Sequence, residues 1–130
     1  MKIFCAFLLT CITAAGLLAI PGDSEVTLNG SYVWNASPNK PGNLKAVFKN
    51  ENNGEWDVAF YFKFNGQDHV YEGKAKGDPD NGSLKGEVKN ERRNRTFTFD
   101  GKTSNGNFTG EHAELRGKDV IQTGTLKLKK

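Results

Sequence analysis

The stretch that decides the fold of this chain is Trp56-Asp57-Val58-Ala59-Phe60-Tyr61-Phe62-Lys63-Phe64. Every even-numbered residue in it is apolar, whereas the charged residues Asp57 and Lys63 occupy odd positions. Side chains two residues apart lie on the same face of a β-strand. The alternation therefore predicts a strand with one face in a hydrophobic core.

The same alternation continues on both sides of this stretch, from Glu25 to the C-terminus. Clusters of Gly, Asn, Asp and Pro interrupt it roughly every ten residues, as between sequential strands. The interruptions are Asn65-Gly66, Asp78-Pro79-Asp80-Asn81-Gly82, Arg92-Arg93-Asn94, Asn105-Gly106 and Arg116-Gly117-Lys118-Asp119. Asn-Gly pairs suit the positive φ angles of two-residue hairpins. The runs between the breaks predict about eight strands, which start near residues 25, 43, 55, 68, 83, 95, 106 and 120.

Connections this short leave no room for crossover helices, so neighbouring strands are expected to pair antiparallel in an up-and-down meander. An open meander would expose its edges, and closure removes them. Glycines also recur in mid-strand on the predicted inner face, which is typical of strands that bend or approach one another closely. They are Gly30, Gly73, Gly86, Gly101, Gly110 and Gly124. The predicted fold class is all-β, with about eight strands closed into a small barrel.

Residues 1–20 are interpreted as a signal peptide and residues 21–130 as a single β-barrel domain. Lys2 precedes an uncharged apolar run, and small residues near Ala19 offer cleavage sites. Two alternatives stay open: a membrane anchor, because the run approaches the roughly 20 residues that span a bilayer, and a lipoprotein acylated on Cys11. Both cysteines, Cys5 and Cys11, lie in the signal, so the exported domain would have no disulfide.

The charge of the chain is nearly balanced, with 18 basic and 15 acidic residues. Lys and Glu are interleaved along the strands, unlike the basic stripe of a nucleic-acid-binding protein, so no nucleic-acid partner is expected. Once the signal is removed, no apolar segment approaches the length of a membrane span. These features predict a secreted or periplasmic protein.

Several segments carry a resemblance to known proteins. They are Trp56-Asp57-Val58, His69-Val70-Tyr71, Arg95-Thr96-Phe97-Thr98-Phe99, Gly110-Glu111-His112-Ala113-Glu114 and Thr123-Gly124-Thr125-Leu126. Together they resemble small secreted β-rich proteins of planctomycete-type bacteria, a resemblance that implies no catalytic or binding residues. In strand pattern the chain is also similar to calycin-type barrels such as lipocalins and avidins, which implies a barrel architecture and no particular ligand.

The strand after Asn105-Gly106 places two polar side chains on its predicted inner face. If Phe108 points inward, then His112 and Glu114 share its face, and polar groups inside an apolar barrel need partners. The other polar residues expected near the same end are Tyr71, His69 and Gln122, the last on the inward parity of Leu126. These five polar residues form a candidate patch at a barrel mouth, where a few polar groups orient an apolar ligand.

Other interpretations of these residues stay open. The strand could leave the core at its end, with Glu114 in solvent and His112 in an ordinary hydrogen bond. His69, His112 and Glu114 are suitable ligand types for a metal, but with only two histidines in the chain we predict no metal and no other cofactor. A hydrolase using His112 and Glu114 requires both to converge in one cleft with Tyr71 or His69.

Two further features invite a functional interpretation. The segment 78–82 offers oxygen ligands but lacks the terminal Glu of a calcium loop, so a hairpin turn is expected there. Trp34 and Tyr61 are the candidates for carbohydrate binding through exposed aromatic rings, because Tyr61 alternates away from the face of Trp56.

The leading hypothesis is a secreted, non-enzymatic β-barrel that binds a small apolar or amphipathic ligand. The sequence contains no motif of a nucleophilic enzyme and no phosphate-binding loop. The alternative is a structural or interaction module of the cell surface, including carbohydrate binding. A ligand carrier predicts a cavity of a few hundred Å³ inside the barrel.

Overall fold

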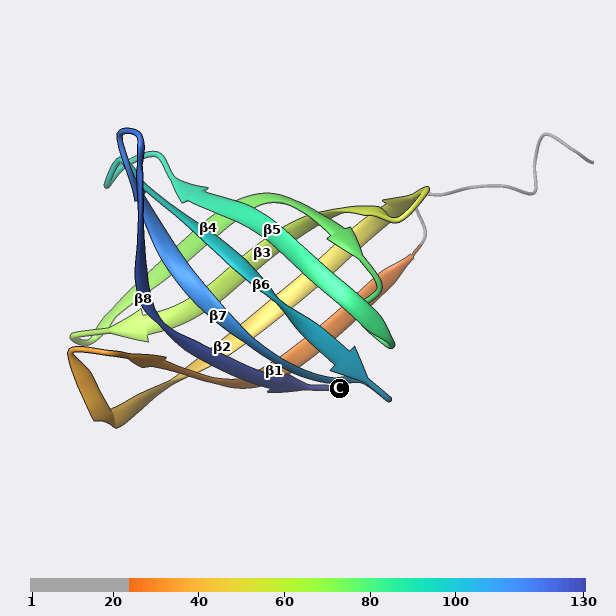
Figure 1. Ribbon diagram of the computed structural model, residues 1–130, viewed down its shortest axis with the longest axis horizontal. Coiled ribbons are helices and arrows are strands. Elements are labelled where there is room, and N and C mark those ends of the chain that lie inside the picture. Colours follow the sequence, from red (N-terminus) through yellow and green to blue (C-terminus); the bar gives the residue numbers. More distant parts are fainter. Residues whose placement is uncertain (1–23) are drawn as a thin grey trace, which may run out of the picture.

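The computed structural model describes residues 24–130, and the predicted signal peptide lies outside this range. The strands are β1 (Glu25–Trp34), β2 (Ser37–Asn52), β3 (Glu55–Phe64), β4 (Gln67–Gly77), β5 (Gly82–Asn90), β6 (Arg95–Ser104), β7 (Asn107–Arg116) and β8 (Asp119–Lys129). Figure 1 shows them wound around a common axis. Among residues 24–130, no helix has the length and apolar character needed to cross a membrane.

The eight strands form a closed barrel in sequence order. β1 closes the ring by pairing antiparallel with β8, where Tyr32 lies opposite Leu126. The predicted all-β, up-and-down barrel is therefore confirmed. One strand begins earlier than predicted: β2 starts at Ser37, not near residue 43, because Ser37 already pairs with Trp34 across a two-residue turn.

The core consists of side chains from alternate positions of all eight strands. In β3, Trp56, Val58 and Phe60 are buried as the alternation predicts. Phe64, on the same parity, is 45% exposed because it is the last residue of the strand and lies at the rim. An eight-stranded barrel has an interior just wide enough for side chains to fill, and here they fill most of it.

The mid-strand glycines mark close approaches between strands, as predicted. A Cβ at Gly124 would lie 1.8 Å from the Val33 carbonyl oxygen and 2.6 Å from Nε2 of His112. At Gly110 it would lie 2.5 Å from the Asp100 carbonyl oxygen and 2.6 Å from the Phe108 ring. An aromatic ring thus covers the glycine at both positions, a device that stabilises coiled sheets. His112 takes its inward position partly as such a covering ring.

The two ends of the barrel differ. We call the end with the turns at residues 35–36, 65–66, 91–94 and 117–118 the open end, and the end with the turns at 53–54, 78–81 and 105–106 the closed end (Figure 1, left and right). At the closed end Leu28 and Leu84 are 0% exposed, and Pro79 of the β4–β5 connection is fully buried. The inward side chains nearest the open end retain a gap between them.

Candidate functional site

A cavity of about 50 Å³ lies inside the barrel, toward the open end. Its lining is almost entirely apolar and aromatic. The lining residues are Tyr32, Trp34, Leu44, Phe60, Phe62, Tyr71, Val88, Phe97, Thr98, Phe99, His112 and Leu126. A water molecule needs about 10–15 Å³ by this measure, so the cavity holds several waters or a short apolar group. The sequence-based expectation that a ligand carrier would have a cavity of a few hundred Å³ is not met, because the cavity is several times smaller.

Trp34 at the end of β1 is the most unusual residue of the lining. Its ring meets His112, Phe97 and Tyr32 edge to face, with centroids 5.1, 5.7 and 6.4 Å away. Its indole Nε1–H is buried and has no acceptor among residues 24–130. A buried polar group without a partner costs free energy. Trp34 therefore lines the cavity with a ring whose hydrogen-bond donor is unsatisfied.

A charged cluster at the open end contains Glu114, which is only 5% exposed. Arg95 donates to both carboxylate oxygens, from Nε at 2.9 Å and from Nη2 at 3.0 Å. Arg116 donates to Oε1 from Nη2 at 3.0 Å. The hydrogen bond from Arg95 is the main reason why the pKa of Glu114 lies below its usual range. The carboxylate is therefore ionised and holds two guanidinium groups in place.

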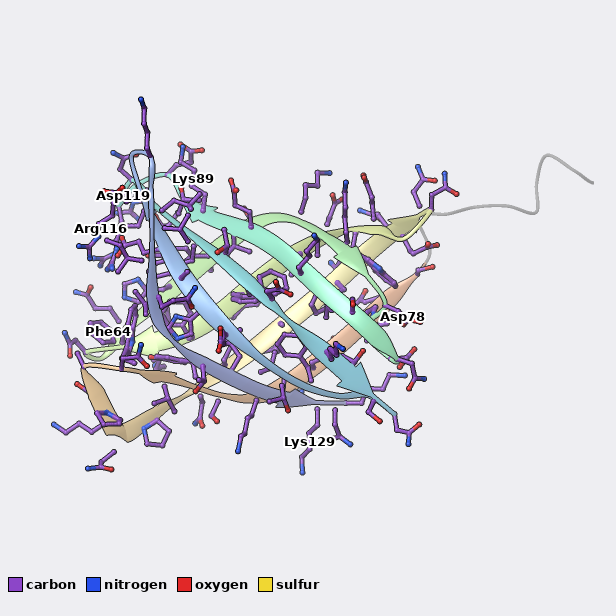
Figure 2. The ribbon with its side chains drawn as sticks, in the orientation of Figure 1. Phe64, Asp78, Lys89, Arg116, Asp119 and Lys129 are labelled. Atoms are coloured by element: carbon purple, nitrogen blue, oxygen red, sulfur yellow. The ribbon has the colours of Figure 1, made fainter. Side chains whose placement is uncertain are left out.

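Arg95 links this cluster to the cavity. Its guanidinium carbon lies 5.1 Å from the ring centroid of Phe97 and 6.0 Å from that of Trp34. Both rings line the cavity, so a fixed cation lies over its aromatic wall, a favourable cation–π geometry. Figure 2 shows Arg116 and Phe64 at the same end of the barrel, far from Asp78 at the closed end.

His112 lines the cavity but has both ring nitrogens engaged. Nε2 lies 3.0 Å from the Val33 carbonyl oxygen and Nδ1 lies 2.7 Å from Oγ1 of Thr123. Because the carbonyl can only accept, Nε2 of the neutral ring carries the proton, and Nδ1 faces the Thr123 hydroxyl, which also lies 3.1 Å from the His112 carbonyl oxygen. Burial lowers the pKa of His112 and so favours this neutral form. The side chain links β7 to β1 across Gly124 of β8.

Tyr71 and His69 both face inward from β4, as predicted. Tyr71 lines the cavity, and burial raises the pKa of its hydroxyl. His69 is 7% exposed and stacks on Phe62, with ring centroids 5.3 Å apart and an angle of 12° between the planes. Its Nε2 is buried and lacks a hydrogen-bond partner within the described part of the chain. Phe62 lines the cavity, whereas His69 is not among its lining residues.

The prediction that Gln122 shares the inward face of Leu126 is wrong. A register shift between His112 and Ala113 inserts a β-bulge, so that His112 pairs with Gly124 and Ala113 with Gln122. The extra residue, Thr123, reverses the parity of the strand beyond it. Gln122 is exposed, on the face of Ala113.

The metal interpretation is also not supported. Within residues 24–130, no three His, Cys, Asp or Glu side chains form a metal-binding group, so His69, His112 and Glu114 do not converge in this way. The oxygen-rich segment at 78–82 is a turn, as expected. There, Asp78 Oδ1 accepts a hydrogen bond from the Asp80 amide, and the Asp80 carboxylate pairs with Lys130.

The two aromatic residues proposed for carbohydrate binding lie in different places. Tyr61 is 39% exposed on the outer face, as its parity predicted. The Lys45 ammonium lies 5.1 Å from its ring centroid and covers one face of the ring. Trp34 faces the interior, so its prediction as an exposed ring is wrong. The two residues do not form a common surface.

Sequence reasoning did not assign Trp34, Phe97, Arg95 or Arg116 to the site. A signal for the arginines was present, because in an up-and-down barrel alternate turns lie at the same end. All four arginines of the chain, Arg92, Arg93, Arg95 and Arg116, lie in or beside two such turns. The open end is therefore rich in arginine, a residue type that the closed end lacks.

The chain was compared with protein-family models, with curated proteins and with solved structures, and no match was found. The geometry of the open end is what bears on function. It combines a small apolar cavity, a lining tryptophan whose buried N–H has no partner among residues 24–130, and a cation over the aromatic wall. Such a combination suits non-covalent binding of a small molecule.

Proposed function

We propose that this protein is a secreted or periplasmic, non-enzymatic binding protein that holds a small apolar or amphipathic molecule in the cavity at the open end. The observation that carries the proposal is Trp34, which lines an apolar cavity and whose buried Nε1–H has no acceptor in residues 24–130. An acceptor on a bound molecule would satisfy it, while the aromatic lining receives the apolar part.

The size of the cavity limits the ligand. Pockets for drug-sized molecules have volumes of about 300–1,000 Å³, several times the 50 Å³ found here. Without movement of side chains, the barrel accepts only a short or flat apolar group, and the rest of the ligand lies at the rim. The proposal is therefore a ligand of few atoms, not a long-chain lipid enclosed by the barrel.

The hydrogen bonds of His112 and the pKa of Glu114 support a binding function over hydrolysis. A general base needs a free lone pair near its reaction partner, but both ring nitrogens of His112 are occupied by Val33 and Thr123. A general acid needs a raised pKa, but that of Glu114 is lowered by its arginine partners. Neither residue is available for proton transfer in this arrangement.

Native mass spectrometry of the protein, purified without denaturation from the compartment to which it is exported, tests the proposal. We expect a stoichiometric adduct of low mass. The Leu44→Phe variant places a larger side chain in the cavity wall and should lose the adduct while keeping the circular dichroism of the barrel. A bare mass, or an adduct that survives in Leu44→Phe, contradicts binding in this cavity.

A further inference from the structure

We propose that the ligand carries a carboxylate, which Arg95 binds at the rim of the open end while a short apolar tail enters the cavity. This inference rests on the proposed function and adds the chemical class of the ligand. It assigns to Arg95 a recognition role that is separate from its ion pair with Glu114.

The first support is the charge of the cluster. Glu114 supplies one negative charge, and Arg95 and Arg116 both pair with it. The cluster is therefore left with one uncompensated positive charge. Arg93, in the β5–β6 connection next to Arg95, hydrogen-bonds a neutral group, Oε1 of Gln67, at 3.1 Å. An anion at this rim would meet an excess of positive charge, and a ligand cation would be repelled.

The second support is the unused bonding capacity of Arg95. Glu114 takes the Nε–H and one N–H of Nη2, whereas a guanidinium has further N–H groups on both terminal nitrogens. Within residues 24–130, the hydrogen bonds of the Arg95 side chain are those to Glu114, so its other N–H groups are not hydrogen-bonded to the protein. A planar fork of this kind matches a carboxylate, which it binds with charge-assisted hydrogen bonds.

The third support is preorganisation. The buried Glu114 carboxylate fixes the guanidinium against Phe97 and Trp34 before any ligand arrives. A side chain already held in its binding geometry loses little entropy when the ligand binds. The same contact sets the direction of the ligand, because the rings beneath Arg95 are the wall of the cavity. An acidic head at Arg95 thus places an attached apolar tail toward the aromatic lining.

The cavity volume decides the length of the tail. A space of about 50 Å³ accepts a few heavy atoms. A short aliphatic or small aromatic carboxylate therefore fits the site, whereas a long-chain fatty acid would leave most of its chain in water. Hexanoate is a suitable probe, since hexan-1-ol and hexylamine have the same chain with a neutral or a cationic head.

The test uses the indole N–H signals of the two tryptophans in ¹H–¹⁵N NMR spectra of the purified protein. We expect hexanoate to shift the Trp34 signal saturably and to leave Trp56 unchanged, because Trp56 at the closed end already donates to the Gly77 carbonyl oxygen at 3.0 Å. Hexan-1-ol should bind at least about tenfold more weakly than hexanoate, and hexylamine more weakly still, since charge-assisted hydrogen bonds are the stronger kind.

The outcomes separate this inference from the proposed function. If hexan-1-ol binds as tightly as hexanoate, the cavity binds ligands but the carboxylate assignment is wrong. If none of the three compounds shifts the Trp34 signal, both proposals fail.

Arg95→Gln should weaken hexanoate binding about tenfold and leave hexan-1-ol binding unchanged. The matched control is Arg92→Gln, which removes an exposed arginine of the β5–β6 connection, three residues before Arg95, that makes no ion pair with Glu114. It should bind hexanoate like the wild type. Arg95→Gln leaves the buried Glu114 without this partner and could fail to fold. In that case Arg95→Lys is used, which keeps the positive charge but loses the planar guanidinium. Hexanoate should still bind this variant more weakly than the wild type. Unchanged hexanoate affinity in a folded Arg95 variant overturns the assignment.

Discussion

The two tryptophans of this barrel show how its ends differ. Trp56 at the closed end donates its indole N–H to the Gly77 carbonyl oxygen at 3.0 Å, whereas the corresponding group of Trp34 at the open end is buried and has no partner in the described residues. The buried hydroxyl of Thr103, also at the closed end, donates a hydrogen bond to the Asp78 carbonyl oxygen at 2.7 Å. The two buried side-chain nitrogens found without a partner among residues 24–130, Trp34 Nε1 and His69 Nε2, both belong to the open end.

This difference assigns stability mainly to the closed end of the barrel and ligand binding to the open end. A fully packed end supplies the hydrophobic stabilisation, which lets the other end keep an unfilled space and an unsatisfied donor. Natural proteins depart from local structural rules mainly at functional sites. The incomplete end is therefore where we place the ligand, and equal substitutions at both ends test whether the division is real.

The largest change in the free energy of unfolding is expected when a phenylalanine at each end is replaced by alanine. Phe108→Ala at the closed end should lower the free energy of unfolding by about 3–5 kcal/mol, the usual cost in a packed core, because its buried ring covers Gly101 and Gly110. Phe97→Ala at the open end should cost less than half as much, since Phe97 is only partly buried. Urea unfolding followed by circular dichroism measures both, and equal losses would contradict the comparison.

A smaller effect is expected when a side chain is enlarged. Leu84→Phe at the closed end should cost about 1–3 kcal/mol, because overpacking forces neighbours to move and Leu84 is completely buried. Leu44→Phe borders the cavity and should cost clearly less, or stabilise the barrel by filling empty space. Midpoints of urea unfolding for the two variants give the answer. A larger loss for Leu44→Phe would show that the cavity is rigid and unable to accept an apolar group.

Much of this fold could be predicted because its signals are local. The alternation from Trp56 to Phe60 and the turn at Asn65-Gly66 each need only a few consecutive residues. The site could be predicted only in part. Tyr71 and His112 were found because parity within one strand places them on the inner face.

The missed features depend on pairing between strands. The bulge at Thr123 lies in the stretch Gln122-Thr123-Gly124-Thr125, where no apolar alternation fixes which residues face inward. It appears only when β8 is aligned with β7, where it turns Gln122 outward. The bond from Arg95 to Glu114 likewise joins residues 19 positions apart, and it forms because Phe97 pairs with Glu114 across β6 and β7.

A pH dependence is expected from His112 at the open end. Its pKa in the folded protein is lowered by burial, whereas an unfolded His titrates near about 6.5. As the pH falls through about 6.5, the unfolded chain binds the proton first, so the stability present at higher pH is progressively lost toward the folded pKa. His112→Gln should show a smaller difference in urea midpoint between pH 7.5 and pH 5.5 than the wild type. An unchanged difference would mean that His112 is not the group responsible.

The smallest effect is expected for the ion pair of the closed end, between Asp80 and Lys130. Both side chains are substantially exposed, at 44% and 53%, and exposed pairs contribute at most about 1 kcal/mol because water and salt screen them. Asp80→Asn should therefore lower the free energy of unfolding by less than about 1 kcal/mol, and 1 M NaCl should remove most of the difference. Glu114→Gln at the open end is the matched change, in which two arginines lose the carboxylate of a buried side chain. Its effect should be larger and less sensitive to salt, since the carboxylate side of these pairs is buried and partly buried pairs are screened less. A salt-sensitive loss at Glu114 would mean that water reaches the arginine cluster, and the preorganised cation at the mouth of the cavity would then lack its anchor.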